Sequence, residues 1–266
     1  MPLTLNEHYT ASAACFIGGT LSVVTQLWLL FDFLPMLRVS KGLKSLHQHL
    51  TLANLFVVLF FFMGAISHFE QRWIFGDTMC KFYVFWCKFT PVASMTLLAL
   101  CLYGEYQHAL NPSLEKKNVS YTIPLCMAWA YGLLWGSLAL TTSEYGQEPA
   151  GFTCTVIWYK VQSFTNYLTI LGFGTPSLLA FYYSFNLWHK GFLIDNPMAQ
   201  AAVGLMISMT AQFSAYAGCY MMVLAGHHLS LYAIAFPQIW TKSVGVVHPF
   251  IYSHVFASDS TNEKEE

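Results

Sequence analysis

The stretch from Leu231 to Phe256 reads LYAIAFPQIWTKSVGVVHPFIYSHVF and guides the interpretation of the whole chain. Its only Asp, Glu, Lys or Arg side chain is Lys242, and about 20 mostly apolar residues are enough for a helix to cross a bilayer. Lys242 lies about eleven residues into the stretch, which at 1.5 Å per residue is roughly 16 Å deep, close to the bilayer centre. The sequence therefore predicts a membrane-spanning helix with a cation near its middle.

The composition of the whole chain agrees with a membrane environment. Of the 266 residues, 56% are hydrophobic and only 9% are charged, whereas soluble domains carry about 25% charged residues. This excludes a soluble enzyme, a coiled coil and a disordered protein. The formal net charge of −1 gives no basic surface for nucleic acid, and the seven cysteines form no zinc-binding pattern with histidine.

Six further stretches are long and apolar enough to span a membrane, and the loops between all seven are short. We therefore predict an all-α membrane protein, a seven-transmembrane-helix bundle occupying residues 1–256, followed by a short, mobile cytoplasmic tail at 257–266. The predicted spans are Ala11–Leu34, His49–Phe69, Met79–Tyr103, Tyr121–Leu140, Ser163–Trp188, Pro197–Ala225 and Leu231–Phe256.

The basic residues of the loops predict the orientation. With the N-terminus extracellular or lumenal, the cytoplasmic side carries Arg38, Lys41, Lys44, Lys116, Lys117, Lys190 and Lys264, and the other side carries Arg72, Lys81 and Lys160. Because cytoplasmic loops are enriched in Lys and Arg, this bias favours an outer N-terminus and an inner C-terminus.

A lysine at the centre of a membrane costs about 2.5–3.5 kcal/mol on insertion scales, so something must offset that cost. One interpretation is an ion pair with a buried carboxylate, or a water-filled cavity, with no chemistry at Lys242. The other is covalent use, because a desolvated lysine amine forms Schiff bases with aldehydes. Position alone does not separate the two interpretations.

The residues around Lys242 carry a more specific signal. Pro237 precedes the lysine, and Pro249 and Tyr252 follow it at Lys-x6-Pro-x-x-Tyr spacing. This run resembles the seventh helix of animal opsins, in which a retinal-binding lysine precedes an Asn-Pro-x-x-Tyr motif. His248 stands where that motif has asparagine.

Other landmarks fit the same resemblance, which extends from Leu37 to Tyr252. The segment from Trp73 to Cys80 resembles the opsin segment that leads to the third-helix cysteine, and Cys154 stands where its partner does. The resemblance therefore implies a Cys80–Cys154 disulfide on the oxidising side of the membrane. Further matches are Trp129 in the fourth span, Pro176 in the fifth, and Tyr216, Ala217 and Gly218 in the sixth.

The resemblance also implies a set of site residues and retinal, all-trans or 11-cis, as the cofactor. Lys242 would form the Schiff base, and Glu148, six residues before Cys154, would be its counterion. Tyr83 stands at the third-helix position of the counterion in vertebrate visual opsins. The chromophore cavity would be lined by Phe173, Trp158, Tyr159, Phe213, Tyr216 and Ala217.

Lys88 complicates this assignment, because it falls inside the third span at a level near the chromophore. It is a rival positive charge, an ion-pair partner of Glu148, or a residue facing water inside the bundle. These alternatives stay open on the sequence.

The cytoplasmic motifs of signalling receptors are altered. The acidic-Arg-Tyr triplet of the third helix reads Gly104-Glu105-Tyr106, which reverses the charge of the residue that engages a G protein. Asn54 replaces the second-helix aspartate, and Phe213-Ser214-Ala215 replaces the tryptophan and proline of the sixth-helix switch, so we expect a straight sixth helix. Glycine at position 104 and the run around Glu148 resemble the branch of retinochrome and the retinal G-protein-coupled-receptor opsins, which are photoisomerases.

Three functions follow. The first is a retinal-binding photoisomerase, converting all-trans- to 11-cis-retinal, with weak or no G-protein coupling. The second is a light-activated G-protein-coupled receptor of phototransduction, and light-dependent nucleotide exchange separates it from the first. The third is a seven-helix receptor for another ligand, in which Lys242 is only an ion-pair residue; failure to trap retinal would identify it.

Overall fold

The computed structural model describes residues 4–37, 39–117, 119–142, 145–147, 153–156, 163–194, 196–227, 236–237, 240–241 and 243–262. These ranges are helical apart from one short hairpin and the connecting turns. The elements are α1 (Leu5–Trp28), the π-helical turn η1 (Leu29–Phe33), α2 (Leu34–Met36), α3 (Lys41–Val58), α4 (Phe61–Phe69), α5 (Gly76–Leu110), the 3₁₀ helix η2 (Pro112–Lys117), α6 (Thr122–Thr142), β1 (Tyr145–Gln147), β2 (Cys154–Val156), α7 (Ser163–His189), α8 (Pro197–Leu224) and α10 (Val244–Asn262).

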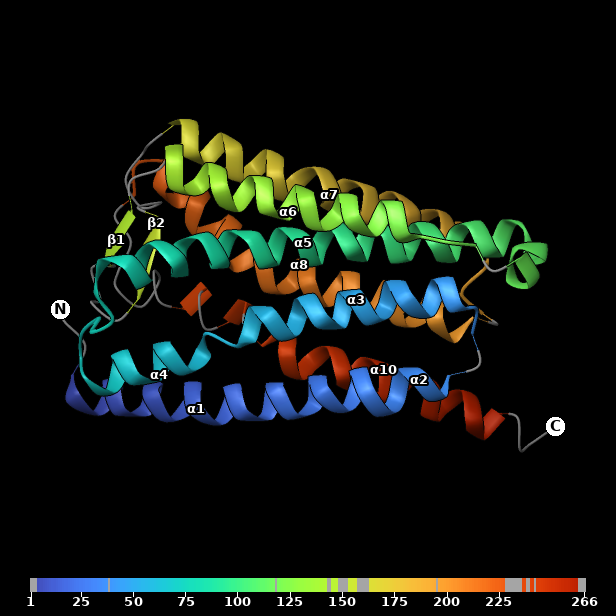
Figure 1. The fold of residues 1–266 in the computed structure, drawn as a ribbon, viewed down its shortest axis with the longest axis horizontal. Helices are drawn as coiled ribbons and strands as arrows, with labels where there is room; N and C mark the ends of the chain where they lie inside the picture. Colours follow the sequence, from blue (N-terminus) through green and yellow to red (C-terminus); the bar gives the residue numbers. More distant parts are fainter. Residues whose placement is uncertain are drawn as a thin grey trace.

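The long helices lie side by side along the longest axis of the molecule (Figure 1). The N-terminus and the β1–β2 hairpin lie at one end of the bundle, and the C-terminus lies at the other. Helix α5 packs against α3, α6, α7 and α8 and forms the centre of the bundle. In the described ranges the chain thus makes seven lengthwise segments: α1 to α2, α3 with α4, α5, α6, α7, α8 and α10. The predicted seven-helix bundle is confirmed.

Apolar side chains cover much of the outer surface of this bundle. Ile123 is 74% exposed, Leu178 is 73% exposed and Phe250 is 70% exposed. Such a surface needs lipid around it, because a soluble protein rarely exposes large contiguous apolar patches. Within the described residues, four helical segments combine the length and hydropathy of a membrane span, namely Leu5–Met36, Lys41–Phe69, Gly76–Leu110 and Thr122–Thr141.

Several helices start earlier than the hydropathy pattern predicts. Helix α1 begins at Leu5 because Thr4 and Glu7 form a capping box, in which the Thr4 side chain accepts from the Glu7 N–H and the Glu7 carboxylate accepts from the Thr4 N–H. Helix α3 begins at Lys41, capped by the Ser40 hydroxyl. Hydropathy marks only the part of a helix that lies in lipid, so it does not show the polar first turns.

The predicted end of the last helix is also wrong. The hydropathy pattern predicts an end at Phe256 and a mobile tail at 257–266, but α10 continues to Asn262. No proline or glycine interrupts residues 257–262, and extending an existing helix needs only one further hydrogen bond per residue.

The sixth span forms one uninterrupted helix. Helix α8 runs without interruption from Pro197 to Leu224, and its only proline is in the first turn, where the missing N–H needs no partner. Asn196 caps it, accepting a hydrogen bond from the Ala199 N–H at 3.0 Å. The connection from α7 is a short turn in which Gly191 has φ +73°, a conformation that favours glycine.

Candidate functional site

The β1–β2 hairpin is fixed onto the start of α5. Cys154 in β2 is disulfide-bonded to Cys80, with 5.3 Å between their Cα atoms, so the predicted disulfide is present. Gln147 in β1 pairs with Cys154 in the antiparallel register of the hairpin. The residue after Gln147 in the sequence is Glu148, the predicted counterion, which lies outside the described residues.

Tyr83 lies one turn after Cys80 and is 2% exposed. Its ring makes edge contacts with Phe60 and Trp73, at centroid distances of 5.7 and 5.4 Å. Trp73 is held in place because its indole N–H donates to the Gly76 carbonyl at 3.0 Å. The neutral phenol at the predicted third-helix position is therefore buried in an aromatic cluster under the disulfide.

Lys242 itself lies outside the described residues, but both of its neighbours are described. Thr241 is helical and buried, and its hydroxyl donates to the Pro237 carbonyl at 2.8 Å. The Gln212 amide of α8 donates to the Ser243 hydroxyl at 3.1 Å. The chain on both sides of Lys242 is thus part of the bundle, and Ser243 is tied to the middle of α8. Gln212 could not be predicted from the sequence, because an isolated amide in an apolar helix carries no motif.

Phe173 and Phe213, two residues of the predicted cavity wall, are in contact. Their ring centroids are 4.3 Å apart, which joins α7 to α8 beside Gln212. Tyr216 is half-buried one turn further along α8. Ala217 is exposed, on the same face as Ser214 and Met221, so its assignment to the cavity stays a prediction. The other two predicted wall residues, Trp158 and Tyr159, lie outside the described residues.

Lys88 is half-buried in the middle of α5. Val84 and Val92, one turn before and after it, are both buried, so Lys88 lies on a face of the helix that is turned towards the bundle. In the described part of the chain Lys88 forms no ion pair. The three alternatives given for it above stay open.

A first polar cluster joins three helices, six residues beyond Lys88 along α5. The Asn54 amide of α3 lies 2.7 Å from Nδ1 of His248 in α10, and the Ser94 hydroxyl of α5 donates to Oδ1 of Asn54 at 2.5 Å. All three side chains are buried. Asn54 and His248, which both depart from the opsin pattern, are therefore hydrogen-bonded to each other.

A second polar cluster surrounds Glu105. The Glu105 side chain is 1% exposed, and its Oε1 lies 3.3 Å from Nε2 of His47, which is completely buried. Nδ1 of His47 lies 2.5 Å from the hydroxyl of Tyr252. The Asn196 amide donates to Oε2 of Glu105 at 3.2 Å. Hydrogen bonds thus connect α3, α5, α10 and the first residue before α8.

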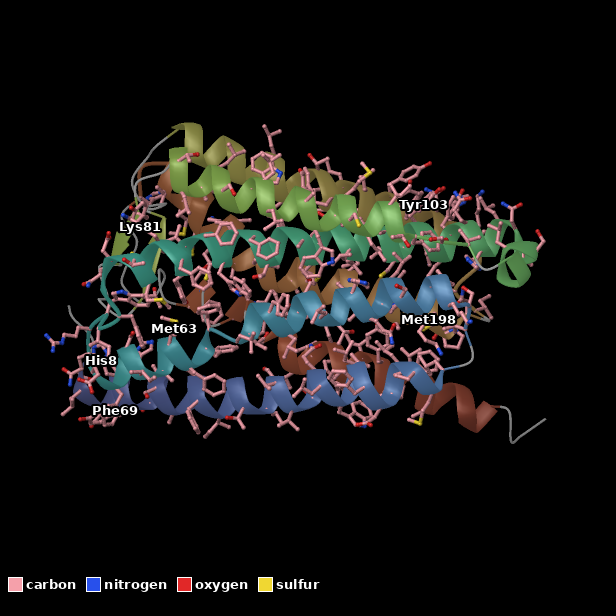
Figure 2. The ribbon with its side chains drawn as sticks, in the orientation of Figure 1. His8, Met63, Phe69, Lys81, Tyr103 and Met198 are labelled. Atoms are coloured by element: carbon pink, nitrogen blue, oxygen red, sulfur yellow. A yellow bond between two sulfur atoms is a disulfide. The ribbon has the colours of Figure 1, made fainter. Side chains whose placement is uncertain are left out.

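This second cluster lies at the end of the bundle that holds the C-terminus. Tyr103 and Met198, each two residues from a member of the cluster, are labelled at that end in Figure 2, and His8 and Lys81 at the other. That Glu105 weakens coupling stays a prediction. The bonds of His47 and Asn196 to Glu105 could not be predicted, because no local motif links these residues.

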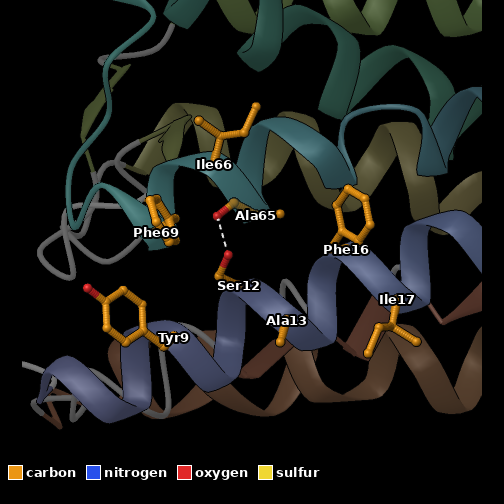
Figure 3. Close-up of a pocket in the computed structure, with 8 residues that line it drawn as sticks. All are labelled: Tyr9, Ser12, Ala13, Phe16, Ile17, Ala65, Ile66 and Phe69. Atoms are coloured by element: carbon orange, nitrogen blue, oxygen red, sulfur yellow. Dashed lines mark hydrogen bonds between the residues drawn. The ribbon is translucent and has the colours of Figure 1, made fainter.

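The described residues also line a groove of about 600 Å³ between α1 and α4 (Figure 3). Its walls are apolar, and the Ser12 hydroxyl donates across it to the Ala65 carbonyl at 2.7 Å. Ile17 on its rim is 66% exposed, so the groove opens to the lipid-facing surface. It shares no residue with the predicted cavity.

Comparisons with known proteins agree with this architecture. Melanopsin-A of Gadus morhua is 25% identical over an alignment of 291 positions, which covers 93% of this chain and 50% of the relative. The visual pigment-like receptor peropsin of Homo sapiens is 26% identical over 184 residues, 66% of this chain and 55% of the relative. The protein "Rhodopsin, G0-coupled" of Mizuhopecten yessoensis is 23% identical over an alignment of 302 positions, which covers 97% of this chain and 75% of the relative.

Among solved structures, the crystal structure of squid rhodopsin superposes with a TM-score of 0.82 at 18% identity, covering 95% of this chain and 83% of that one. No family model matches the chain. The chain spans about half the length of the first two relatives above. It is related to animal opsins along most of its length, it has the seven-helix fold of rhodopsin, and it is a multi-pass membrane protein with the disulfide on the outer side.

Proposed function

We propose that this chain binds retinal through Lys242 and acts as a photoisomerase that converts all-trans- to 11-cis-retinal, with weak or no coupling to a G protein. The observation that carries the proposal is the packing on both sides of Lys242. Thr241 is buried, and Ser243 is bonded to Gln212, next to the Phe173–Phe213 contact. The opsin-like Lys-x6-Pro-x-x-Tyr run therefore belongs to a folded bundle with aromatic side chains beside it.

The described residues suit a long conjugated apolar ligand. Phe173 and Phe213 offer aromatic surface, and Tyr83 offers a buried phenol that can donate or accept a hydrogen bond without adding charge. Retinal, when bound, supplies the light absorption and the double bond that isomerises. The protein supplies the attachment point, the shape of the cavity and the electrostatics.

Each site residue has a distinct part in the proposal. The amine of Lys242 condenses with the aldehyde, forming a C=N bond and releasing one water. Glu148 balances the positive charge of the protonated linkage, because a buried cation without a partner is costly. Tyr83 offers its hydroxyl for a hydrogen bond close to this protonated linkage. The hairpin supports the part given to Glu148, since the preceding residue, Gln147, is paired with the disulfide-bonded Cys154.

Extraction of retinal isomers tests this function. The purified chain is loaded with all-trans-retinal, and the isomers are resolved in the dark and after illumination. We expect 11-cis-retinal to accumulate in the light, Lys242→Ala to abolish this, and Lys88→Ala to retain it. Unchanged isomer ratios in the loaded parent chain would overturn the proposal, and isomerisation by Lys242→Ala that is lost in Lys88→Ala would move the attachment point to Lys88.

A light-activated receptor is the second candidate, favoured by the name of the Mizuhopecten yessoensis relative, "Rhodopsin, G0-coupled". Light-dependent guanine-nucleotide exchange on an added G protein, at a rate well above the dark rate, would select it. The charge reversal at Glu105 is the residue-level argument against it.

A further inference from the structure

We infer that Glu105 is the centre of a clamp that holds the start of α8 against α5 and keeps the cytoplasmic end of the bundle closed. The clamp consists of Glu105, His47, Asn196 and Tyr252. The inference does not depend on retinal binding, because none of these residues belongs to the predicted cavity.

The hydrogen bonds of the clamp are directional and converge on one carboxylate. A carboxylate only accepts hydrogen bonds, so His47 must donate through Nε2–H and Asn196 through its amide. The second ring nitrogen of His47, Nδ1, is hydrogen-bonded to the hydroxyl of Tyr252. Hydrogen bonds to a charged group are stronger than those between neutral groups. A buried carboxylate that lost both donors would be left unpaired, and this penalty holds the closed arrangement together.

Asn196 is the part of the clamp that reaches α8. Its Oδ1 caps the helix by accepting from the Ala199 N–H, while its amide donates to Glu105. One side chain therefore both starts α8 and fixes that start to α5. An outward movement of this end of α8 has to break the bond between Asn196 and Glu105.

Neighbouring contacts support the same closed arrangement. Lys190, in the turn that leads to α8, donates to the Tyr106 hydroxyl at 3.1 Å. Gly104 allows α3 to approach α5 closely, because a Cβ atom there would lie 2.8 Å from Leu43 Cδ2.

Amide hydrogen exchange of the full chain in lipid nanodiscs tests the clamp. The key variant is Asn196→Ser, because serine still caps a helix but is too short to donate to Glu105. We expect the amides of residues 201–210 to exchange roughly 10-fold faster or more. This corresponds to a loss of about 1.4 kcal/mol in the stability of the closed arrangement. The exposed Glu70, at the other end of the bundle, provides the control Glu70→Gln, which should leave these amides unchanged.

A pair of variants separates the clamp from a general loss of stability. Asn196→Asp keeps the cap but places a second carboxylate beside Glu105. The two repel each other, so exchange should be faster than in Asn196→Ser. Adding Glu105→Gln should bring it back towards the parental rate, since the glutamine amide can donate to the new carboxylate. Parental exchange in both Asn196→Ser and Asn196→Asp, or no rescue by Glu105→Gln, would overturn the inference.

Discussion

The two ends of the bundle are held together by different means. At the outer end, the Cys80–Cys154 disulfide fixes the hairpin onto α5, and aromatic rings pack around Tyr83 below it. At the cytoplasmic end, buried hydrogen bonds around Glu105 and Asn54 join helices that are distant in the sequence. The outer end is thus fixed by a covalent bond and apolar packing, which suits a cavity of defined shape. The inner end depends on polar pairing.

The largest expected effect is at the outer end. Cys154→Ser removes the disulfide, whose contribution is typically about 2–4 kcal/mol. We expect a large loss of folded protein, measured as the monodisperse fraction after purification and as the midpoint of thermal unfolding. The matched control is Cys126→Ser, since Cys126 is an exposed free cysteine. Equal losses in both variants would show that the disulfide does not stabilise the outer end.

The second effect is at the inner end. Asn54→Ala leaves the Ser94 hydroxyl and Nδ1 of His248 without their partner, which we expect to cost about 1–3 kcal/mol. The midpoint of thermal unfolding should fall by several degrees. Asn186→Ala, which removes a bond to the Tyr182 carbonyl at the helix surface, should have little effect. If the two variants have the same midpoint of thermal unfolding, the inner end is not held by its buried polar pairs.

A third variant tests the region between the two ends. A Cβ atom at Gly245 would lie 2.5 Å from Ser22 Cβ and 2.6 Å from Val58 Cγ1, so Gly245→Ala forces α10 away from α1 and α3. We expect a loss of about 1–3 kcal/mol together with weaker retinal loading, because position 245 is three residues after Lys242. Gly218→Ala is the control, as no atom lies within 4 Å of a Cβ there. Parental loading and melting of Gly245→Ala would contradict the close packing.

The smallest effect is in the groove between α1 and α4. Ser12→Ala removes the bond to the Ala65 carbonyl, and we expect a loss of about 0.5–1.5 kcal/mol with no change in retinal loading. Thr10→Ala, whose hydroxyl bonds within its own helix, is the comparison and should lose less. A loading defect in Ser12→Ala would mean that the groove takes part in ligand binding.

The outer end could be predicted from the sequence further than the inner end. The spans are visible as apolar stretches, and Cys80 and Cys154 stand in recognisable positions. The polar pairing could not be predicted in the same way: His47 and Asn196 are 58 and 91 residues from Glu105, and a single sequence contains nothing that links them. Helix ends were misplaced where capping, as at Thr4, rather than hydropathy sets them.

The most direct test of the central claim is mass spectrometry of the chain after incubation with retinal and reduction by borohydride. The account predicts one retinyl group, located on the peptide that contains Lys242, and its disappearance in Lys242→Ala while Lys88→Ala keeps it. A chain that carries no retinyl group, or carries it on Lys88, would contradict the account.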